Sequence, residues 1–378
     1  MLLSRTVFSL WALVVAVLAA ATFVEWRCGS DTAARTVYGS LWFAGLWAAL
    51  LLAGGWLSLR CRLHRRGFVF GLHLALAVIL AGAGITRFTA GRGTLHLRQG
   101  AAVQSYVDDA SGEERPLPFP VKLLLFDIAY HPGTNLPADY ISFLKVGDEV
   151  CRVSMNRIRR EQGYRLLQAS YDPDEMGSTL MVCRDPWGIG VTYAGYLLLA
   201  VSMAGVLYER LGWRGLLCTV LPVAVLGCGL GQVKPLTPVL RSPLLAVHVS
   251  VIASAYLLLA LTALCSAAAL LVPRWSERLD GWNGRLLCPA VFLLAAGIFI
   301  GAVWANISWG RYWGWDPKEV WALITLLLFS LPLHGASFPW LRSARVRHLW
   351  CLTAFLSVWM TWYGVNTLLG GMHAYGGV

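Results

Sequence analysis

Charged residues are scarce in this sequence. Asp, Glu, Lys and Arg make up 13% of its 378 residues and hydrophobic residues make up 57%, whereas about 25% of a soluble domain is charged. The shortage excludes a large soluble core and indicates a protein that crosses a membrane several times. The formal net charge of +11 does not indicate nucleic-acid binding. The arginines stand in short connectors between apolar runs, where they orient the chain in a bilayer.

Paired cysteines are also missing. The chain has nine cysteines but no CxxC and no CxxCH motif, which argues against a zinc site, a thioredoxin-like motif and a haem attached covalently to the chain itself. Most cysteines lie in apolar runs, where a free thiol is simply a small buried group. Cys151 and Cys183 lie in the one long polar region, and either a disulfide or two free thiols is open for them.

A clear cleavage site after the first apolar run is absent as well. The run 6–24 is long for a signal peptide, so we expect a retained membrane helix. A spanning helix needs about 20 mostly apolar residues. The candidate spans number about nine: 6–24, 38–59, 67–86, 188–208, 215–231, 244–272, 287–305, 319–334 and 349–368.

The connectors between these spans set the orientation. Those of one side hold about twice as many basic residues as the short connectors of the other side, which predicts that the first set is cytoplasmic. The N-terminus is then inside and the C-terminus outside. The basic set consists of Arg5 and the connectors 60–66, 209–214, 273–286 and 335–348.

The orientation places the long polar region 87–187 outside the membrane. Proline and glycine divide it into short apolar or alternating pieces, which is typical of strands. We therefore expect a small β-rich extracytoplasmic domain, attached to membrane helices at both ends. The expected strands are 94–98, 121–129, 140–146, 149–154, 164–168 and 179–183.

A tryptophan-rich polar segment, 306–324, stands between two apolar runs. Indole faces at a membrane surface can hold a large flat apolar ligand, while nearby charges hold its polar edge. The alternative is an aromatic belt at the bilayer interface, although a belt needs neither the glycine spacing nor the embedded charges. The aromatic residues are Trp309, Tyr312, Trp313, Trp315 and Trp321, and the charged ones include Asp316, Lys318 and Glu319.

Four of the eight histidines lie in or at the ends of apolar runs. By the predicted orientation, His73 and His334 form an inner pair, and His248 and His373 form an outer pair. Ionisable groups in membrane spans are costly and usually functional, and two imidazoles can supply both axial ligands of a haem iron. The alternative is that each ring caps a helix or bonds a backbone carbonyl. No special role is expected for His64, His96, His131 and His348.

The second half of the chain resembles a known family of haem-handling membrane proteins. WGRYWGWDPKEVWALI at 309–324 is similar to the tryptophan-rich WWD signature, and its surroundings resemble the CcsA (ResC) branch. PVLRSPLLAVHV at 238–249 and GGMHAY at 370–375 are similar to the two external histidine regions of that branch. His334 stands where the branch has a membrane histidine.

The first half resembles the partner protein, CcsB (ResB). His73 matches its membrane histidine, and VSMN at 153–156, GYRLLQASY at 163–171 and DPWG at 185–188 match its outer-domain pattern. The whole chain therefore resembles a fused CcsBA-type System II cytochrome c synthetase. This division gives CcsB-like helices in 1–86, the outer domain in 87–187, a further CcsB-like helix and link in 188–214, and a CcsA-like haem-handling part in 215–378.

The resemblance implies a function in the cytoplasmic (inner) membrane of a bacterium. Haem b enters at His73 and His334, crosses the membrane, and is held outside by the WWD segment with His248 and His373 as axial ligands. Apocytochrome c then receives it on the two thiols of a CxxCH motif. The expected partners are haem, apocytochrome c and the lipid bilayer, with thiol-reducing proteins as further candidates and no nucleic acid.

The resemblance also suggests roles within the WWD segment. Trp309, Trp313 and Trp315 are candidates to pack on the porphyrin, with Tyr312 beside them, and Arg311 or Lys318 to pair with a propionate. Asp316 is a further candidate for the haem site. Pro317 and Glu319 are typical of a first helical turn, however, so the favoured role of Asp316 is the N-cap of that helix. Trp321 falls inside that helix and is expected to pack.

The sequence departs from the family at one point, and two alternative functions remain as hypotheses. The outer region is only about a hundred residues long, much shorter than is usual for the family, which puts apocytochrome recognition in doubt. One alternative is a haem-binding membrane protein that delivers haem without ligating it, although the CcsB-like half argues against this. A transporter or scaffold for a non-haem ligand is the third hypothesis.

Overall fold

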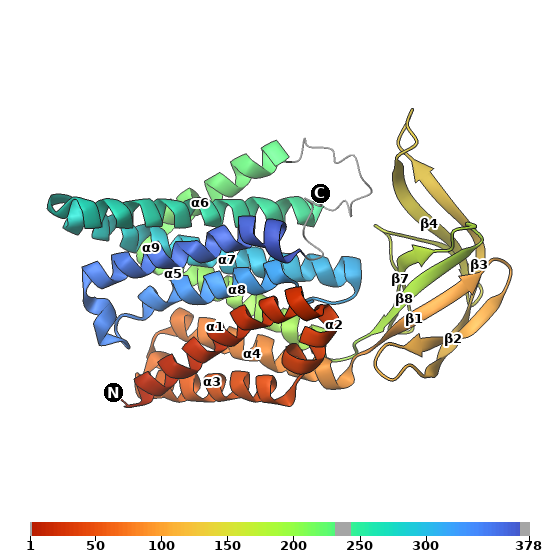
Figure 1. Ribbon diagram of the computed structural model, residues 1–378, viewed down its shortest axis with the longest axis horizontal. Helices are drawn as coiled ribbons and strands as arrows, with labels where there is room; N and C mark the ends of the chain where they lie inside the picture. Colours follow the sequence, from red (N-terminus) through yellow and green to blue (C-terminus); the bar gives the residue numbers. More distant parts are fainter. Residues whose placement is uncertain (1, 231–242, 371–378) are drawn as a thin grey trace.

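The computed structural model describes residues 2–230 and 243–370, without the side chains of residues 218, 226 and 228–230. A helical bundle forms one part, and a β-sheet domain lies at one end of it (Figure 1). The long helices are α1 (Leu2–Cys28), α3 (Leu41–Arg60), α4 (Gly67–Thr89), α5 (Gly188–Leu230), α6 (Pro243–Leu271), α7 (Ser276–Trp309), α8 (Pro317–Ser330) and α9 (Ala344–Trp359). A π-helix, η6 (Met360–Leu369), continues α9, and shorter turns are α2 (Ser30–Ala33), η1 (Ala34–Tyr38) and η4 (Leu331–His334).

The described residues contain six helices that are long and apolar enough to cross a membrane, so the predicted count of nine is not supported. These lie within α1, α3, α4, α5, α6 and the stretch Pro273–Trp309. Two predicted spans, 188–208 and 215–231, fall within the one long helix α5, which has a non-helical residue at Gly212 (φ 64°). The predicted span 319–334 overlaps α8, whose 14 residues measure about 21 Å against a hydrocarbon core of about 30 Å.

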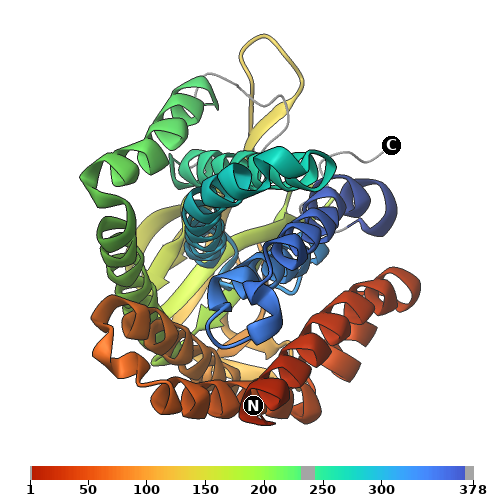
Figure 2. The same cartoon turned by 90° about the vertical axis from the view of Figure 1, so that its left-hand side faces the viewer.

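Small residues let the helices of the bundle approach closely. Gly82 of α4 lies directly against Thr192 of α5, and Gly71 against Ser202, with no room for a side chain at either glycine. Close packing at small residues is a common way for helices to associate in membranes. Seen along the bundle, α1, α3 and α4 lie along one side and α5 leads from them to α6 (Figure 2).

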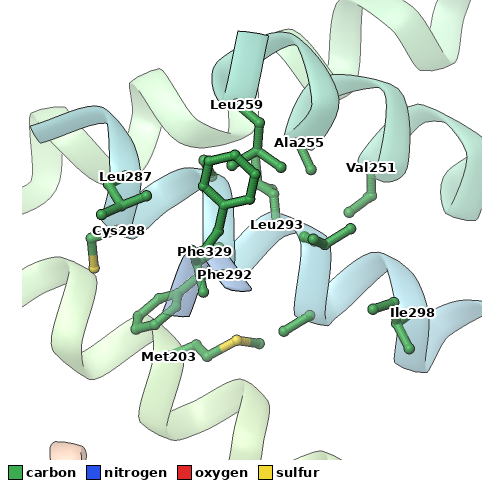
Figure 3. Packing of buried hydrophobic residues seen from close by; sticks show 14 of the residues in the cluster. Met203, Val251, Ala255, Leu259, Leu287, Cys288, Phe292, Leu293, Ile298 and Phe329 are labelled. Atoms are coloured by element: carbon green, nitrogen blue, oxygen red, sulfur yellow. The ribbon is translucent and has the colours of Figure 1, made fainter. Parts of the chain in front are cut away.

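The largest apolar core joins α5, α6, α7, α8 and α9. Met203, Leu259, Phe292 and Phe329 belong to it, and Figure 3 shows these side chains meeting between the helices. A second core joins α1 and α3 to α8. The helix α8, which follows the tryptophan-rich segment, is therefore fixed from both halves of the chain.

The β-sheet domain, named the outer domain after its predicted location, is one antiparallel sheet of eight strands in the order β5-β4-β3-β2-β1-β8-β7-β6, which confirms the predicted β-rich domain. All six expected strands are present, and β2 and β6 are additional. The strands are β1 (Gly91–Arg98), β2 (Ala102–Asp108), β3 (Glu114–Tyr130), β4 (Pro137–Val146), β5 (Glu149–Ser154), β6 (Arg159–Glu161), β7 (Tyr164–Tyr171) and β8 (Gly177–Arg184).

The sheet curls so that β4 and β5 also contact β7. Alternate residues face its interior, as the buried Leu95 and Leu97 do on β1, where the intervening His96 is exposed. Such alternation is typical of a sheet with one buried face. Cys151 on β5 and Cys183 on β8 are both free thiols. Of the two alternatives for this pair, the structure therefore has the free thiols and not the disulfide.

Candidate functional site

A cavity of about 370 Å³ lies among α6, α7, α8, η6 and the WWD segment, residues 306–324. It is named the outer cavity after the predicted orientation of the chain. Its size falls within the range of ligand pockets. The lining is mostly apolar and aromatic with a few polar groups. The lining includes His248, Tyr256, Gly301, Trp304, Trp313, Lys318, Glu319, Thr361, Trp362 and Asn366.

His248 lies in the second turn of α6 and faces α7. Its Nδ1 is 2.7 Å from the carbonyl oxygen of Gly297. Because a carbonyl oxygen only accepts, Nδ1 must carry the proton, and in the neutral ring Nε2 keeps the lone pair. Gly301 lies one turn further along α7, and a Cβ there would be 2.5 Å from His248 Cε1. The ring therefore occupies space that only a glycine leaves open.

His373, the expected partner of His248, lies outside the described residues, so the outer pair stays a prediction. The described part of the chain nevertheless leads to the same cavity. Thr361, Trp362 and Asn366 of η6, the helix that precedes residue 373, line the cavity together with His248.

The WWD segment has a defined backbone. Gly310 ends α7 in the left-handed region (φ 70°), where glycine carries no Cβ penalty. Asp316 is the N-cap of α8, as predicted: its Oδ1 accepts from Lys318 N at 3.0 Å. Glu319 Oε2 accepts in return from Asp316 N and from Gly314 N, at 3.3 and 2.8 Å, which completes a capping box. Asp316 is buried and already bonded to the helix start.

The structure directs the three candidate tryptophans differently. Trp313 lines the cavity. Trp315, a non-glycine residue with φ 58°, stacks on Tyr38 with ring centroids 4.7 Å apart and joins the core with α1 and α3. Trp309 packs edge-on against Trp304 at 4.8 Å. Trp304, which sequence reasoning missed, is the member of that pair on the cavity wall.

The remaining candidates of the segment are partly buried. Tyr312 OH donates to Thr86 Oγ1 at 2.7 Å, and burial raises the pKa of Tyr312. The guanidinium of Arg311 lies against Gly314, where a Cβ would be 3.3 Å from its Cζ. Burial and the nearby Arg92 lower the pKa of Arg311. Trp321 packs inside α8 as expected, with its Nε1 donating to Thr22 Oγ1 at 3.2 Å.

The structure brings together the two histidines of the predicted inner pair. The ring centroids of His73 on α4 and His334 at the end of η4 are 5.8 Å apart, with the rings nearly perpendicular at 85°. His73 Nδ1 lies 2.8 Å from Val69 O, and His334 Nδ1 lies 2.9 Å from Ser330 O. Each Nδ1 therefore carries its proton, and each Nε2 keeps a lone pair in the neutral ring.

Two of the other histidines bond differently. His348 is 1% exposed, and its Nδ1 lies 3.1 Å from Asn283 Nδ2, in a polar cluster with Ser266. His96 Nε2 contacts the carboxylate of Asp172 at 3.1 Å on the surface of the outer domain. Neither ring shares the Nδ1-to-carbonyl bond of His73, His248 and His334.

Two family models match the chain. "ResB-like family" matches residues 59–192, and "Cytochrome C assembly protein" matches residues 189–373. The chain joins a ResB-like region to a cytochrome c assembly region. It is a multi-pass membrane protein with one region similar to each of these families. The β-sheet domain lies in the ResB-like match, and the cavity with His248 lies in the cytochrome c assembly match.

Curated relatives resemble parts of the chain. "Cytochrome c biogenesis protein CcsA" of Saccharum officinarum is 45% identical over 104 residues, 27% of this chain and 31% of that protein. The protein of the same name from Oryza sativa is 46% identical over 103 residues, 26% of this chain and 31% of that protein. "Protein NrfI" of Wolinella succinogenes is 35% identical over 205 residues, 47% of this chain and 22% of that protein. The chain thus spans less than a third of the length of these relatives.

Proposed function

We propose that this chain handles haem in cytochrome c maturation as a CcsBA-type System II protein. It takes up haem at His73 and His334, carries it across the membrane and presents it at His248 and His373. There the haem is attached to the CxxCH thiols of apocytochrome c. The matches to a ResB-like region and a cytochrome c assembly region in one chain support the pathway.

One observation carries the proposal for haem. The three candidate ligands among the described residues, His73, His248 and His334, all place Nδ1 within 2.7 to 2.9 Å of a backbone carbonyl. Histidines that bind metals usually donate their other ring N–H in this way, which fixes the tautomer and the ring plane. The bond alone also fits the alternative of a purely structural histidine. This bond recurs at all three candidates and is absent from His96 and His348, which favours His73, His248 and His334 as ligands of the haem iron.

The outer cavity suits a flat, largely apolar substrate with a polar edge. Trp304, Trp313 and Trp362 offer aromatic surface, and Lys318 offers a cation to a propionate. The chain's own contribution is to hold and orient haem and to exclude water, because the bond-forming chemistry belongs to haem and thiols. Each thiol adds across a vinyl double bond. One S–C and one C–H bond form, one S–H bond and one π bond break, and no net electron transfer occurs.

The test begins with the purified full chain from haem-replete cells. A Soret band is expected in the visible spectrum, and a spectrum without one overturns the haem proposal. Co-expression with a CxxCH apocytochrome, followed by haem staining of a denaturing gel, then separates ligation from delivery. A haem-stained cytochrome band that depends on this chain supports ligation. A haem-loaded chain that yields no stained cytochrome refutes ligation and leaves delivery.

A further inference from the structure

Arg165 of the outer domain contacts the start of the WWD segment. It lies on β7, and its Nη1 donates to Asn306 O and to Asn306 Oδ1, both at 2.9 Å. Its Nη2 donates to Gly310 O at 3.1 Å. One guanidinium thus binds three acceptors at the C-terminal end of α7, 141 and 145 residues away in the sequence.

These acceptors need a donor from elsewhere. The last carbonyls of a helix have no partner within the helix, and a cation at a C-terminus is favoured by the helix dipole. Asn306 is 3% exposed, and its Nδ2 donates to Tyr193 OH at 2.7 Å. A buried amide without partners would be costly. Arg165 therefore satisfies groups that α7 leaves open, and its planar fork reaches more than one acceptor at once.

The surroundings of Gly310 leave little freedom. A Cβ on Gly310 would be 2.5 Å from Cys183 Sγ and 3.3 Å from Leu167 Cδ1. Strands β7 and β8 therefore pack directly against the residue at which α7 ends.

A second connection lies two residues further on. Tyr312 OH donates to Thr86 Oγ1, which donates to Asp185 Oδ2, each at 2.7 Å. Asp185 Oδ1 also accepts from Gly188 N at the start of α5, at 2.8 Å. The WWD segment is thus bound at Gly310 and at Tyr312, immediately before the cavity residue Trp313.

We propose that Arg165 is a positioning residue for the outer haem site. By holding the end of α7, it lets the outer domain fix Trp313 relative to His248, so the site is complete only when that domain is seated. The contact runs from the ResB-like region to the assembly region and gives one physical reason for the two to work together. This inference rests on the proposed function.

The test compares Arg165→Met and Arg165→Lys with Arg160→Met in the full-length protein. Arg160 is a matched control, because it lies directly opposite Arg165 on β6 and is exposed. Arg165→Met should lower haem-stained cytochrome about tenfold, as expected for the loss of charge-assisted hydrogen bonds. Arg165→Lys should be intermediate, because an ammonium lacks the planar fork. Arg160→Met should match the wild type.

A second background separates positioning from general damage. In His248→Ala, which has already lost the outer ligand, adding Arg165→Met should leave the remaining haem per protein unchanged. The inference is overturned if haem per protein falls in that background as much as Arg165→Met lowers it in the wild type. It is also overturned if Arg165→Met alone gives a normal spectrum and normal maturation. If the Arg165→Met protein does not accumulate, Arg165→Lys and Asn306→Ala take its place, and their haem per protein is compared with and without His248→Ala in the same way. A wild-type protein without haem instead sinks the proposed function itself.

Discussion

Gly301 offers a sharp test of the outer site, because it faces the ring of His248 without being a candidate ligand. In Gly301→Ala, the new Cβ would lie 2.5 Å from His248 Cε1 and 2.7 Å from its Nδ1. Ordinary van der Waals contact requires about 3.5 Å, so the imidazole must move by about 1 Å. That movement strains or breaks the 2.7 Å bond from Nδ1 to Gly297 O.

The expected loss follows from the role of that bond. Removing a group that orients a metal-bound histidine typically lowers metal affinity by about 10- to 100-fold. The bond itself contributes only about 1 kcal/mol to stability, while alanine in place of glycine favours a helix by a similar amount. Gly301→Ala should therefore fold normally and yet lose outer-site haem.

The assay compares two alanine substitutions on the same helix. Gly284 also lies on α7, and nothing stands within 4 Å of a Cβ built there. Gly284→Ala thus shares the gain in helix propensity without touching the site. Haem per protein from the Soret band and haem-stained cytochrome should fall in Gly301→Ala alone. Equal values for the two variants would refute the view that the His248 ring position matters for haem.

Three further predictions concern individual residues. His248→Ala should abolish cytochrome c maturation, and added imidazole should partly restore it. The control His64→Ala, in an exposed connector, should mature cytochrome normally. Wild-type haem staining in His248→Ala would contradict this prediction. His73→Ala or His334→Ala should lower co-purified haem, and an unchanged Soret band in either would remove the inner pair. In the outer domain, backbone N–H groups of the β2–β3 turn hold the pKa of buried Asp108 below its usual 3.8. Because the pKa of Asp108 is lower in the folded than in the unfolded protein, its ionised carboxylate stabilises the fold fully above about pH 4, and this stabilisation is lost as the pH falls. Asp108→Asn should therefore make unfolding, followed by circular dichroism, less sensitive to acid. An unchanged midpoint of acid unfolding would contradict this prediction.

Much of the local structure could be predicted from the sequence because its signals are local. Proline and glycine mark the ends of the strands, and Asp316 with Glu319 is a helix-start pattern that the structure confirms. β6 was missed because three residues are too few to show alternation. The count of spans differed because hydropathy does not reveal where two apolar runs join into one helix, as in α5. It also does not reveal where an apolar run forms a helix too short to cross a membrane, as in α8.

The directions of the tryptophans could not be predicted. Trp313 and Trp315 are two residues apart in an irregular segment, so no helical or strand period relates them. The left-handed backbone at Trp315 turns its ring toward Tyr38 instead of the cavity. The contacts of Gly301 with His248 and of Arg165 with Asn306 join positions far apart in the chain, and composition or spacing carries no signal for them.

The double attachment of the outer sheet limits how it can move. The chain enters the sheet from α4 and leaves it into α5, two helices that pack along each other at Gly82 and Thr192, and the bond between Thr86 and Asp185 ties the two exits together. A domain on a single stalk can swivel freely, whereas one on two adjoining stalks can only rock about the line between them. A polypeptide pulling on this sheet therefore loads α4 and α5 through the chain itself, and loads the end of α7 through the hydrogen bonds of Arg165.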